Sequence, residues 1–521
     1  MKDKYLYIID IRFKQKNLDL SKYIDKEAEF LSLTPYSSYI LNLYEKNSLT
    51  LANIIDNLDF KKRVLEEYQN IEKVLENDYL FLLRDFATTK TFEIYLKELF
   101  TFFDKKISSG YKIIYITDAN IAIDSSVSNN FYSYIYKYNL FYKTIKIDNI
   151  DNIFYKKNRL ISNIFKIVNE KNIFLKIYNK FNKNSNLELN YDNIYFKDIY
   201  EFIDEFSINQ KVDISHIKHI YKNSIVLNIF KNSKIKLHPF TFLANNKNYS
   251  EILLYTKNNI PKIFMQHGSY IQENIFLKYN EIYPADINFV FNDYTKKLFE
   301  KRGAKNVYSV GSIKFNYEIK EKKKRYDFLY ITYCTSYAYT GLQIFSEDNN
   351  LSIDGYNIYL RHKSIIELFG TKFKDKKICI KFQGGIFTGD MNYIPFLELS
   401  KKYNNITVEF FTPLSKLFQK SKYIISDYIS SEFINRDIHY KKDIILFKSN
   451  PIPIGKTILQ DMEKLFILVD TIDDLEDKIN NIEKITKKRR KYSDIIEYYS
   501  SKKCDTKKIV TDIIKKQIKL G

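Results

Sequence analysis

The chain has 521 residues, of which 45% are hydrophobic and 28% are charged. This length and balance exclude a small disulfide-stapled scaffold and a disordered or collagenous chain, and they predict about two to four globular domains. Lys and Arg number 83 against 63 Asp and Glu, so the net charge is +20. Such a charge favours anionic partners, among them nucleotide phosphates, nucleic acid and an anionic membrane leaflet.

The cysteines and the N-terminal residues predict a cytoplasmic protein. Cys334, Cys379 and Cys504 are far apart and form neither a CxxC pair nor a disulfide framework, which fits a reducing compartment. The first apolar run is interrupted by Asp10 and Arg12 and does not resemble a secretion signal. The sequence contains no uncharged apolar stretch long enough to span a bilayer, so any membrane contact is expected to be peripheral.

The first half of the chain predicts two strands with a helical region between them. Residues 5–11 are apolar and β-branched, as in a buried strand, and residues 112–117 form a second such run. Between them, apolar residues recur at spacings of three and four over residues 56–103, which predicts an amphipathic helix pair. Residues 148–221 give no clear boundaries.

The second half alternates strand and helix patterns. Strands are predicted at residues 263–265, 287–291, 307–310, 328–333, 377–382, 407–411, 423–426 and, as the last one, 443–447, and helices at 293–301, 356–369, 413–420 and 430–440. This alternation predicts parallel sheets with helices on both faces. Residues 318–325 have one apolar residue in eight and are expected to be a linker, whereas residues 487–521 carry 12 basic and 4 acidic residues in a helical pattern.

These features divide the chain into four parts. Residues 1–317 are expected to form an N-terminal Rossmann-like domain with helical insertions, and residues 326–486 a second Rossmann-like domain, joined by the linker at 318–325. Residues 487–521 are expected to form a basic C-terminal helix or tail. Its apolar stripe is expected to pack on the protein, with lysines that either face an anionic leaflet or are simply solvated.

Polar groups at strand ends are the first candidates for a site, because ligands of parallel α/β sheets bind there. Gln266, His267 and Gly268 directly follow the strand at 263–265. An imidazole titrates near neutral pH and suits a general base, and a glycine beside it lets a substrate approach the backbone. The alternative is a partly buried histidine that caps a helix.

Two further strand ends carry groups that suit a phosphate. Asp427 ends a strand, and Ser430 and Ser431 begin the next predicted helix, where backbone N–H groups and hydroxyls favour an anion. Lys381 is followed by Gln383, Gly384 and Gly385, so that a cation and a flexible backbone could meet a phosphate. The alternatives are ordinary N-capping at the serines, and a solvated lysine beside a plain turn.

Other candidates are set aside. Residues 360–363, Leu-Arg-His-Lys, lie within a helical pattern and are predicted to be an exposed helix face. No Asp-x-Asp pair of the kind that holds a catalytic metal is present, so neither a metal nor another cofactor is expected.

The order of these motifs resembles the CDP-glycerol glycerophosphotransferase-like and related surface-polysaccharide transferases. The resemblance rests on residues 261–268, 289–294, 308–312 and 424–431 with the basic linker between them, and it covers about residues 234–447. It implies the GT-B fold, in which two Rossmann-like domains with parallel sheets face a central cleft. Two departures are evident: the family's Lys-x-His-Pro is replaced by Lys381-Phe382-Gln383-Gly384, and Ile429 lengthens its Asp-Tyr-Ser-Ser motif.

The resemblance implies a transferase that moves a sugar or polyol phosphate from a nucleotide-activated donor, with CDP or CMP favoured, to a lipid-linked or glycan hydroxyl in bacterial surface-polysaccharide synthesis. His267 would be the general base. The donor would be held by Lys381, Gln383, Gly384, Asp427, Ser430 and Ser431, and the acceptor side of the cleft would be lined by Gln266, Gly268, Gly311 and Ser312. The expected location is cytoplasmic and peripheral to the membrane.

Two other functions remain open. A nucleic-acid-binding protein would account for the charge and for 45 Tyr and 40 Phe, but these residues are spread along the whole chain and form no recognition motif. Nucleic acid is therefore not an expected partner. The second is a GT-B-shaped protein that binds glycan without catalysis, for which Gln383 in place of a histidine is the reason.

Overall fold

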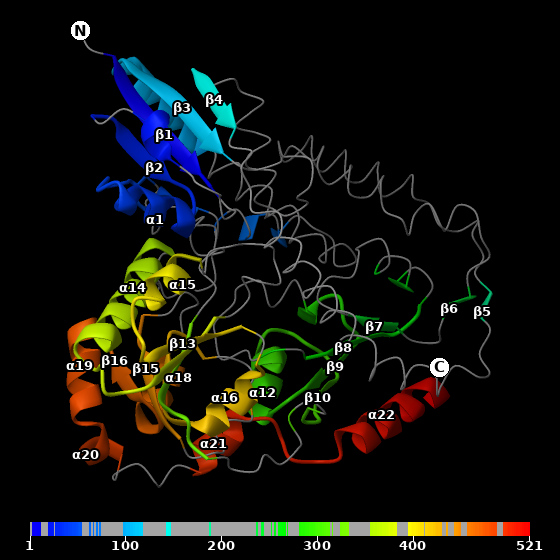
Figure 1. Ribbon diagram of the computed structural model, residues 1–521. Helices are drawn as coiled ribbons and strands as arrows, with labels where there is room; N and C mark the ends of the chain where they lie inside the picture. The colour runs from blue at the N-terminus through cyan, green and yellow to red at the C-terminus, as the bar shows by residue number, and fades with distance from the viewer. Residues whose placement is uncertain are drawn as a thin grey trace.

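The computed structural model describes a chain built around three parallel sheets (Figure 1). It describes residues 3–11, 19–24, 27–54, 97–117, 142–146, 259–266, 281–312, 323–332, 355–382, 394–410, 412–429, 442–449, 456–486 and 493–520, with shorter stretches between residues 62 and 435. The prediction of an α/β fold with parallel sheets is confirmed. Within this part of the chain, no helix is both long and apolar enough to cross a bilayer.

The C-terminal sheet has six strands, all paired in parallel. They are β11 (Tyr326–Ile331), β12 (Ile378–Lys381), β13 (Ile406–Glu409), β14 (Ser421–Ser426), β15 (Asp443–Phe447) and β16 (Ile467–Val469). Their spatial order is β13-β12-β11-β14-β15-β16, the doubly wound order of a Rossmann sheet. The apolar runs are nearly continuous because both faces of the sheet are covered.

Helices cover the two faces of this sheet separately. One face packs against α14 (Gly355–Thr371), α15 (Ile394–Ser400) and α19 (Ile472–Asn480). The other packs against α16 (Leu414–Lys420), α18 (Lys456–Leu465) and α21 (Ser493–Tyr499), while α20 (Ile482–Thr486) follows α19. The end of the predicted linker is tied to this domain, because Lys324 and the backbone of Arg325 donate to carbonyls at the end of α16.

The predicted elements of this half agree with the structure to within a few residues at each end, with one exception. The strand at 443–447 is not the last one, because β16 follows it and pairs with β15. A strand of three residues between two helices shows no periodicity of its own, which is why the sequence pattern missed it. The predicted helix at 430–440 lies mostly outside the described residues.

The middle sheet comprises four parallel strands in the order β10-β9-β8-β7. They are β7 (Thr241–Leu243), β8 (Lys262–Met265), β9 (Ile287–Val290) and β10 (Val307–Ser309). One face packs on α12 (Asp293–Lys301) through Phe299, and the other on α22 (Thr506–Leu520) through Val510 and Ile514. The apolar stripe of the C-terminal helix therefore packs on the protein, as predicted, while Lys507, Lys508, Lys515 and Lys516 are exposed.

The N-terminal sheet also has four parallel strands, in the order β2-β1-β3-β4. They are β1 (Lys4–Asp10), β2 (Glu29–Ser32), β3 (Tyr111–Thr117) and β4 (Lys143–Lys146), with α1 (Pro35–Leu43) and α2 (Leu51–Ile54) after β2. Residues 97–108 are helical, and most of the rest of the predicted helix pair lies outside the described residues. Residues 1–317 thus hold two separate parallel sheets, together with a small antiparallel pair, β5 (Leu187–Glu188) and β6 (Lys236–Leu237).

The N-terminal sheet lies beside the C-terminal domain, with α1 against α14 and α15 (Figure 1). Tyr36 and Ile40 of α1 belong to the same buried cluster as Tyr359 and Phe396. Asn42 donates to the hydroxyl of Tyr359 over 3.4 Å. The helix α14 is therefore covered on more than one side.

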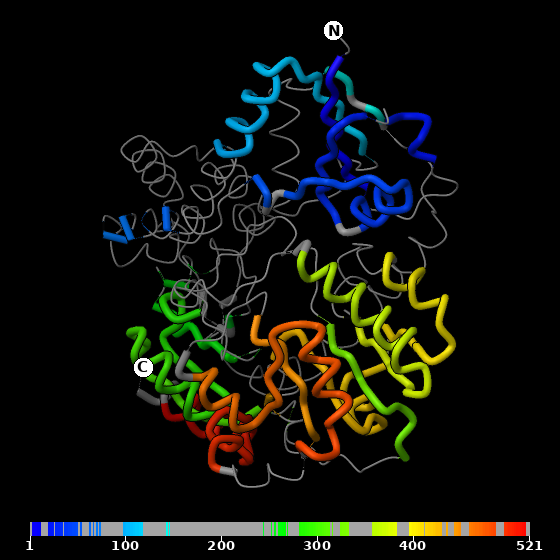
Figure 2. Tube along the Cα trace, turned by 90° about the vertical axis from the view of Figure 1, so that its left-hand side faces the viewer, coloured from blue at the N-terminus to red at the C-terminus, as the bar shows by residue number. Residues whose placement is uncertain are grey.

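A short C-terminal segment joins the C-terminal domain to the middle sheet. Between α21 and α22, the backbone N–H of Lys502 donates to the carbonyl of Phe291 over 2.8 Å, and the thiol of Cys504 approaches the carbonyl of Val310 at 3.0 Å. On the other side, the N–H of Ser501 donates to the carbonyl of Asn435 over 3.3 Å. The red end of the chain accordingly lies next to the green middle sheet in Figure 2.

Gly311, which follows β10, is the residue that the backbone of this C-terminal segment approaches closely. Its φ is +73°, and a Cβ added there would lie 2.3 Å from the carbonyl oxygen of Lys502. Any side chain would therefore be strained in backbone conformation and would also collide with the backbone of the C-terminal segment.

We predict that Gly311→Ala destabilises the protein more than Gly303→Ala. Gly303 has a φ of +92° with nothing within 4 Å of an added Cβ, so its replacement carries only the conformational cost of about 1–2 kcal/mol. Overpacking at Gly311 should add about 1–3 kcal/mol to that cost. Urea unfolding of both variants measures the difference, and equal losses would show that the C-terminal segment does not depend on this contact.

Candidate functional site

The carboxyl ends of β11 and β14 form the switch point of the C-terminal sheet. The chain leaves β11 toward β12 and β13 on one side, and it later returns on the other side as β14. The backbone N–H of Asp427 donates to the carbonyl of Ile331, and that of Thr332 donates to the carbonyl of Lys381 over 3.1 Å. Lys381 and Asp427, both predicted from the sequence, are thus brought to one edge where α/β sheets bind ligands.

Asp427 lies at the centre of a buried polar network and is fully buried. Its Oδ2 accepts from the hydroxyl of Tyr330 over 2.8 Å and lies 2.6 Å from Nε2 of His362. Its Oδ1 accepts from Nη1 of Arg361 over 3.3 Å. One carboxylate therefore connects β14, β11 and the helix α14.

Arg361 extends this network to β15. Its guanidinium donates to the carbonyl of Ser449 over 3.0 Å and to the hydroxyl of the same residue, and it lies 4.1 Å from the ring centroid of Phe447. Only 7% of Arg361 is exposed. Its charge is balanced by Asp427, and its planar group is held in one orientation by bonds on two sides.

The prediction that residues 360–363 form an exposed helix face was wrong, because Leu360 and Lys363 are half-buried and the two residues between them are buried. Arg361 and His362 are buried, because α14 is covered by its own sheet as well as by α15 and α1. A signal was present in the sequence: apolar residues occupy 358–360, 365, 366, 368 and 369, around most of the helix circumference, which is typical of a buried helix. Charges inside such a helix require buried partners.

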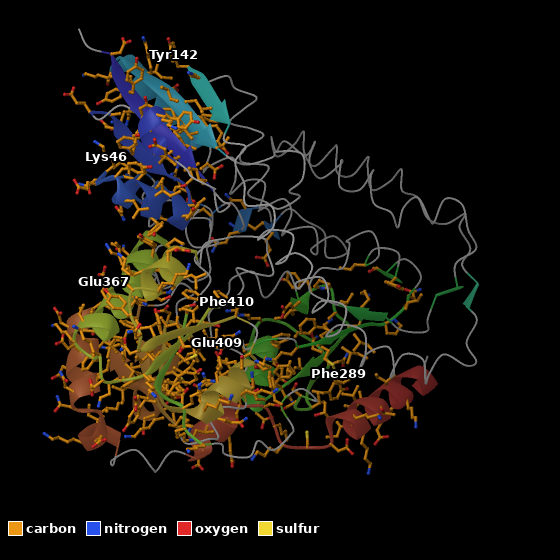
Figure 3. The ribbon with its side chains drawn as sticks, viewed as in Figure 1. Lys46, Tyr142, Phe289, Glu367, Glu409 and Phe410 are labelled. Atoms are coloured by element: carbon orange, nitrogen blue, oxygen red, sulfur yellow. The ribbon has the colours of Figure 1, made fainter. Side chains whose placement is uncertain are left out.

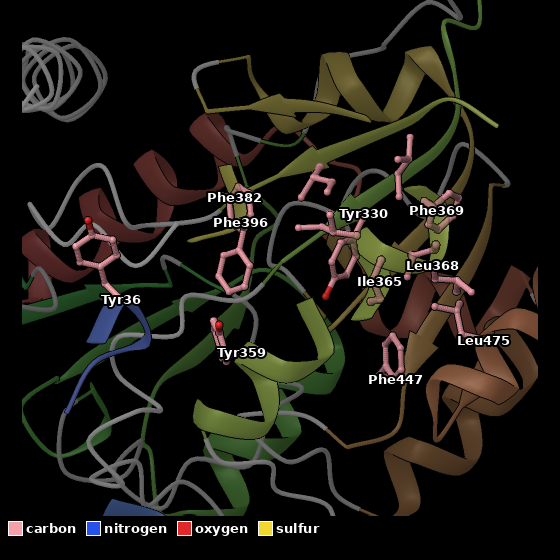
Figure 4. Packing of buried hydrophobic residues seen from close by; sticks show 14 of the residues in the cluster. Tyr36, Tyr330, Tyr359, Ile365, Leu368, Phe369, Phe382, Phe396, Phe447 and Leu475 are labelled. Carbon is pink, nitrogen blue, oxygen red and sulfur yellow. The ribbon is translucent and has the colours of Figure 1, made fainter. Parts of the chain in front are cut away.

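His362 is 1% exposed and is surrounded by rings. Its imidazole makes edge contacts with Tyr330, Phe382 and Phe396, at centroid distances of 5.7, 6.3 and 5.0 Å. Three of these four side chains are labelled in Figure 4, among the buried residues beside α14. Because the Asp427 carboxylate is an acceptor, Nε2 carries a hydrogen, whereas Nδ1 has no hydrogen-bond partner among the described residues.

An orphaned ring nitrogen is unfavourable in a buried site. Leaving a buried acceptor unsatisfied costs about 1–3 kcal/mol. Such a cost is typical of an atom that receives its partner from a ligand or that takes part in proton transfer. The arrangement therefore presents a guanidinium and an orphaned imidazole nitrogen at the switch point, which are groups that suit an anion.

The network shifts the pKa values of two acids. Burial raises the pKa of Asp427. The neighbouring His362, Arg361 and Tyr330 hydroxyl together lower it by a larger amount, so the pKa of this carboxyl lies below its ordinary value of 3.8. Burial, and then the charge of Asp427, raise the pKa of the Tyr330 hydroxyl well above 10. Tyr330 therefore remains a donor, and Asp427 remains ionised at neutral pH.

The other predicted residues are distributed differently. The ammonium of Lys381 donates to the carbonyl of Phe410, which follows β13 (Figure 3). At the middle sheet, the side chain of Gln266 donates to the carbonyl of Gly268 over 2.6 Å and accepts from the N–H of Phe291. Gly311 contacts the C-terminal segment, and Ser312 beside it is buried.

Several of the predicted site residues lie outside the described part of the chain. His267, Gln383, Gly384, Ser430 and Ser431 lie outside the described residues, and so does the predicted opposition of His267 and Ser431 across a cleft. Among the residues that are described, no three His, Cys, Asp or Glu side chains cluster as metal ligands.

We predict that Asp427→Asn lowers the free energy of unfolding at pH 7 by about 3–5 kcal/mol, because it leaves Arg361 buried without its counter-charge. The folded-state pKa of Asp427 is depressed, so its contribution to stability is present above 3.8 and is lost as the pH falls through the folded-state pKa. The difference in the free energy of unfolding between the variant and the wild type, measured by urea unfolding, should therefore become smaller below pH 4. Asp375→Asn, at a carboxylate that is 70% exposed, is the control and should leave the midpoint unchanged.

Comparisons with known proteins give distant structural likenesses. No protein-family model matches the sequence, and no curated protein matches it. Among solved structures, UDP-GlcNAc 2-epimerase of Methanocaldococcus jannaschii aligns over 78% of this chain and 91% of its own, with 12% identity and a TM-score of 0.33. MurG of Acinetobacter baumannii aligns over 79% and 93%, with 10% identity and a TM-score of 0.31.

A third structure, a TarM variant of S. aureus in a complex that contains UDP, aligns over 49% of this chain with 10% identity and a TM-score of 0.27. The match spans about half of the TarM chain, 48% of its length. With identities of 10–12% and TM-scores below 0.5, the case for a function depends on the residues of the site.

Proposed function

We propose that the chain is a GT-B transferase that binds a nucleotide-activated donor at the switch point of its C-terminal sheet. The observation that carries this proposal is the buried Arg361–Asp427–His362 network at the carboxyl ends of β11 and β14. A doubly wound sheet binds nucleotides at this position, and the cations Arg361 and Lys381 suit their phosphates.

The donor and acceptor classes follow from the sequence resemblance. A CDP- or CMP-linked sugar or polyol is the favoured donor, and a hydroxyl of a lipid-linked or glycan molecule is the acceptor. The product would be part of a bacterial surface polysaccharide. In this assignment Lys381 neutralises charge on the donor phosphates, Ser430 and Ser431 donate hydroxyl hydrogen bonds to them, and backbone N–H groups at the start of the predicted helix add to these bonds.

His267 would remove the proton of the acceptor hydroxyl. The side chain of Gln266 bonds the carbonyl of Gly268 and the N–H of Phe291, and so ties the residues on both sides of His267 to the end of β9. These bonds hold the two sequence neighbours of His267, and this supports the assignment of the base to that residue, because a general base must be held within hydrogen-bond reach of its substrate.

Lys381→Ala should weaken nucleotide binding roughly tenfold or more, since a hydrogen bond to a charged group contributes about 1.5–3 kcal/mol. Lys377→Ala is the matched control. It removes an exposed lysine at the amino end of the same strand, on the opposite edge of the sheet, and should change the affinity less than about twofold. Titration calorimetry with CDP, CMP, UDP and GDP measures both variants, and no binding of any of them to the wild type would contradict the proposed function.

His267→Ala should lower the rate of nucleotide release from a competent donor and acceptor by about 10²–10⁴, the usual contribution of a general base. Nucleotide affinity should remain at the wild-type value, because the base acts on the acceptor. Unchanged turnover would assign the proton transfer to another residue.

A peripheral position on the membrane is part of the proposal. Each exposed lysine of α22 contributes about 1 kcal/mol at an anionic surface. Replacing Lys507, Lys508, Lys515 and Lys516 by Glu should therefore release the protein from anionic vesicles at moderate salt, as measured by sedimentation, with neutral vesicles as the control. Undiminished sedimentation would leave α22 a structural element of the middle sheet.

A further inference from the structure

We propose that His362 takes up a proton when the nucleotide phosphate binds, so that its Nδ1–H donates to a phosphate oxygen. This inference rests on the proposed function and names a residue of the same site. It assigns a role to a side chain of α14 that belongs to none of the sequence motifs that suggested a site.

The geometry fixes which nitrogen is available. Nε2 lies 2.6 Å from Oδ2 of Asp427 and carries the hydrogen of that bond, while Nδ1 has no partner among the described residues. In a neutral imidazole, Nδ1 is then an acceptor. A phosphate offers acceptors only. A neutral ring would therefore place the Nδ1 lone pair against a lone pair of a phosphate oxygen, whereas a protonated ring would donate Nδ1–H to that oxygen.

The charges of the network make the proton and the anion mutually dependent. Arg361 and Asp427 balance each other, so a proton on His362 would give the buried network one uncompensated positive charge. An isolated charge is unfavourable in a buried site, and an anion beside it removes that penalty. Proton binding and phosphate binding should therefore strengthen each other by the same factor.

His362 is surrounded by groups from several elements. From β11 the ring meets Tyr330, whose hydroxyl is committed to Asp427, and from α15 it meets Phe396. From β12 it meets Phe382, while the neighbouring Lys381 is directed to the carbonyl of Phe410. Asp427, which follows β14, and Arg361 on the same helix complete the charged surroundings.

Titration calorimetry of CDP at pH 7.5, in HEPES and in Tris, tests the proposal because the two buffers release different heat with each proton. The wild type should take up as much as one proton per CDP, and its affinity should fall as the pH rises, by at most about tenfold per pH unit. His362→Gln keeps an amide N–H for Asp427 but has no titrating nitrogen. It should bind CDP with almost no proton uptake and with an affinity that is independent of pH.

Tyr330→Phe is the matched control. It removes another donor from the same carboxylate and leaves the imidazole in place, so proton uptake should persist. If His362→Gln binds CDP with the uptake of the wild type, a different group takes the proton and the inference is wrong, although the proposed function stands. If the wild type binds no nucleotide, the proposed function fails and this inference fails with it.

A second measurement is available if His362→Gln does not fold. The chain has 6 histidines, so nitrogen NMR of histidine-labelled wild type can follow each ring. One ring that changes from neutral to doubly protonated when CDP is added would support the proposal. Spectra in which no ring changes its protonation would overturn it.

Discussion

One buried carboxylate, that of Asp427, fixes the geometry of the C-terminal domain at the carboxyl edge of its sheet. It accepts bonds from Tyr330, Arg361 and His362, and Arg361 in turn bonds Ser449 after β15. Removing these groups from water is expensive, and a buried ion pair often adds little to stability compared with an apolar replacement. The network is therefore better explained by what it positions, namely a guanidinium and an imidazole at the switch point.

The N-terminal sheet contains the same carboxylate–tyrosine arrangement. Asp10 accepts from Tyr115 over 2.7 Å, and it is paired in register with Thr117, two residues later. In the C-terminal sheet Asp427 lies beside Thr332, and its partner Tyr330 is again two residues earlier. The sequence Tyr-Ile-Thr occurs at both places, at residues 115–117 and 330–332.

This repetition distinguishes the features that belong to the fold from those that are specific to the candidate site. Both pairs of strands, β1 with β3 and β11 with β14, lie at the switch point of their sheet. An aspartate bonded to a tyrosine is therefore a recurring feature at the carboxyl ends of the two central parallel strands of these sheets. Asp10 accepts from the hydroxyls of Tyr115 and Thr117, and Asp427 holds Arg361 and His362 as well as a tyrosine. The Arg361 guanidinium and the His362 imidazole are contributed to the second edge by α14.

The sequence predicted those parts of the structure that depend on local patterns. The strands around Asp427 and Lys381 were found because apolar runs end there in polar residues, and this placed both side chains at the correct edge. Arg361 and His362 were missed because their burial depends on a partner 65 or more residues away and on helices packed against α14. Strand order, likewise, arises from pairings between distant segments, which a single sequence does not display.

The two halves of the candidate site are joined by hydrogen bonds rather than by the linker alone. Gln266 accepts from the N–H of Phe291, whose carbonyl accepts from Lys502, and the adjacent Ser501 donates to the carbonyl of Asn435. Asn435 lies eight residues after Asp427 on the same chain segment. The C-terminal segment thus lies between the end of β9 and Asn435, and Gly311 gives it the space to do so. A change in the position of the end of β9 relative to Asn435 must break these bonds or carry the segment with it. In the proposed function, the orientation of a donor at Asp427 toward an acceptor near Gln266 therefore depends on residues 499–505, which need not touch either substrate.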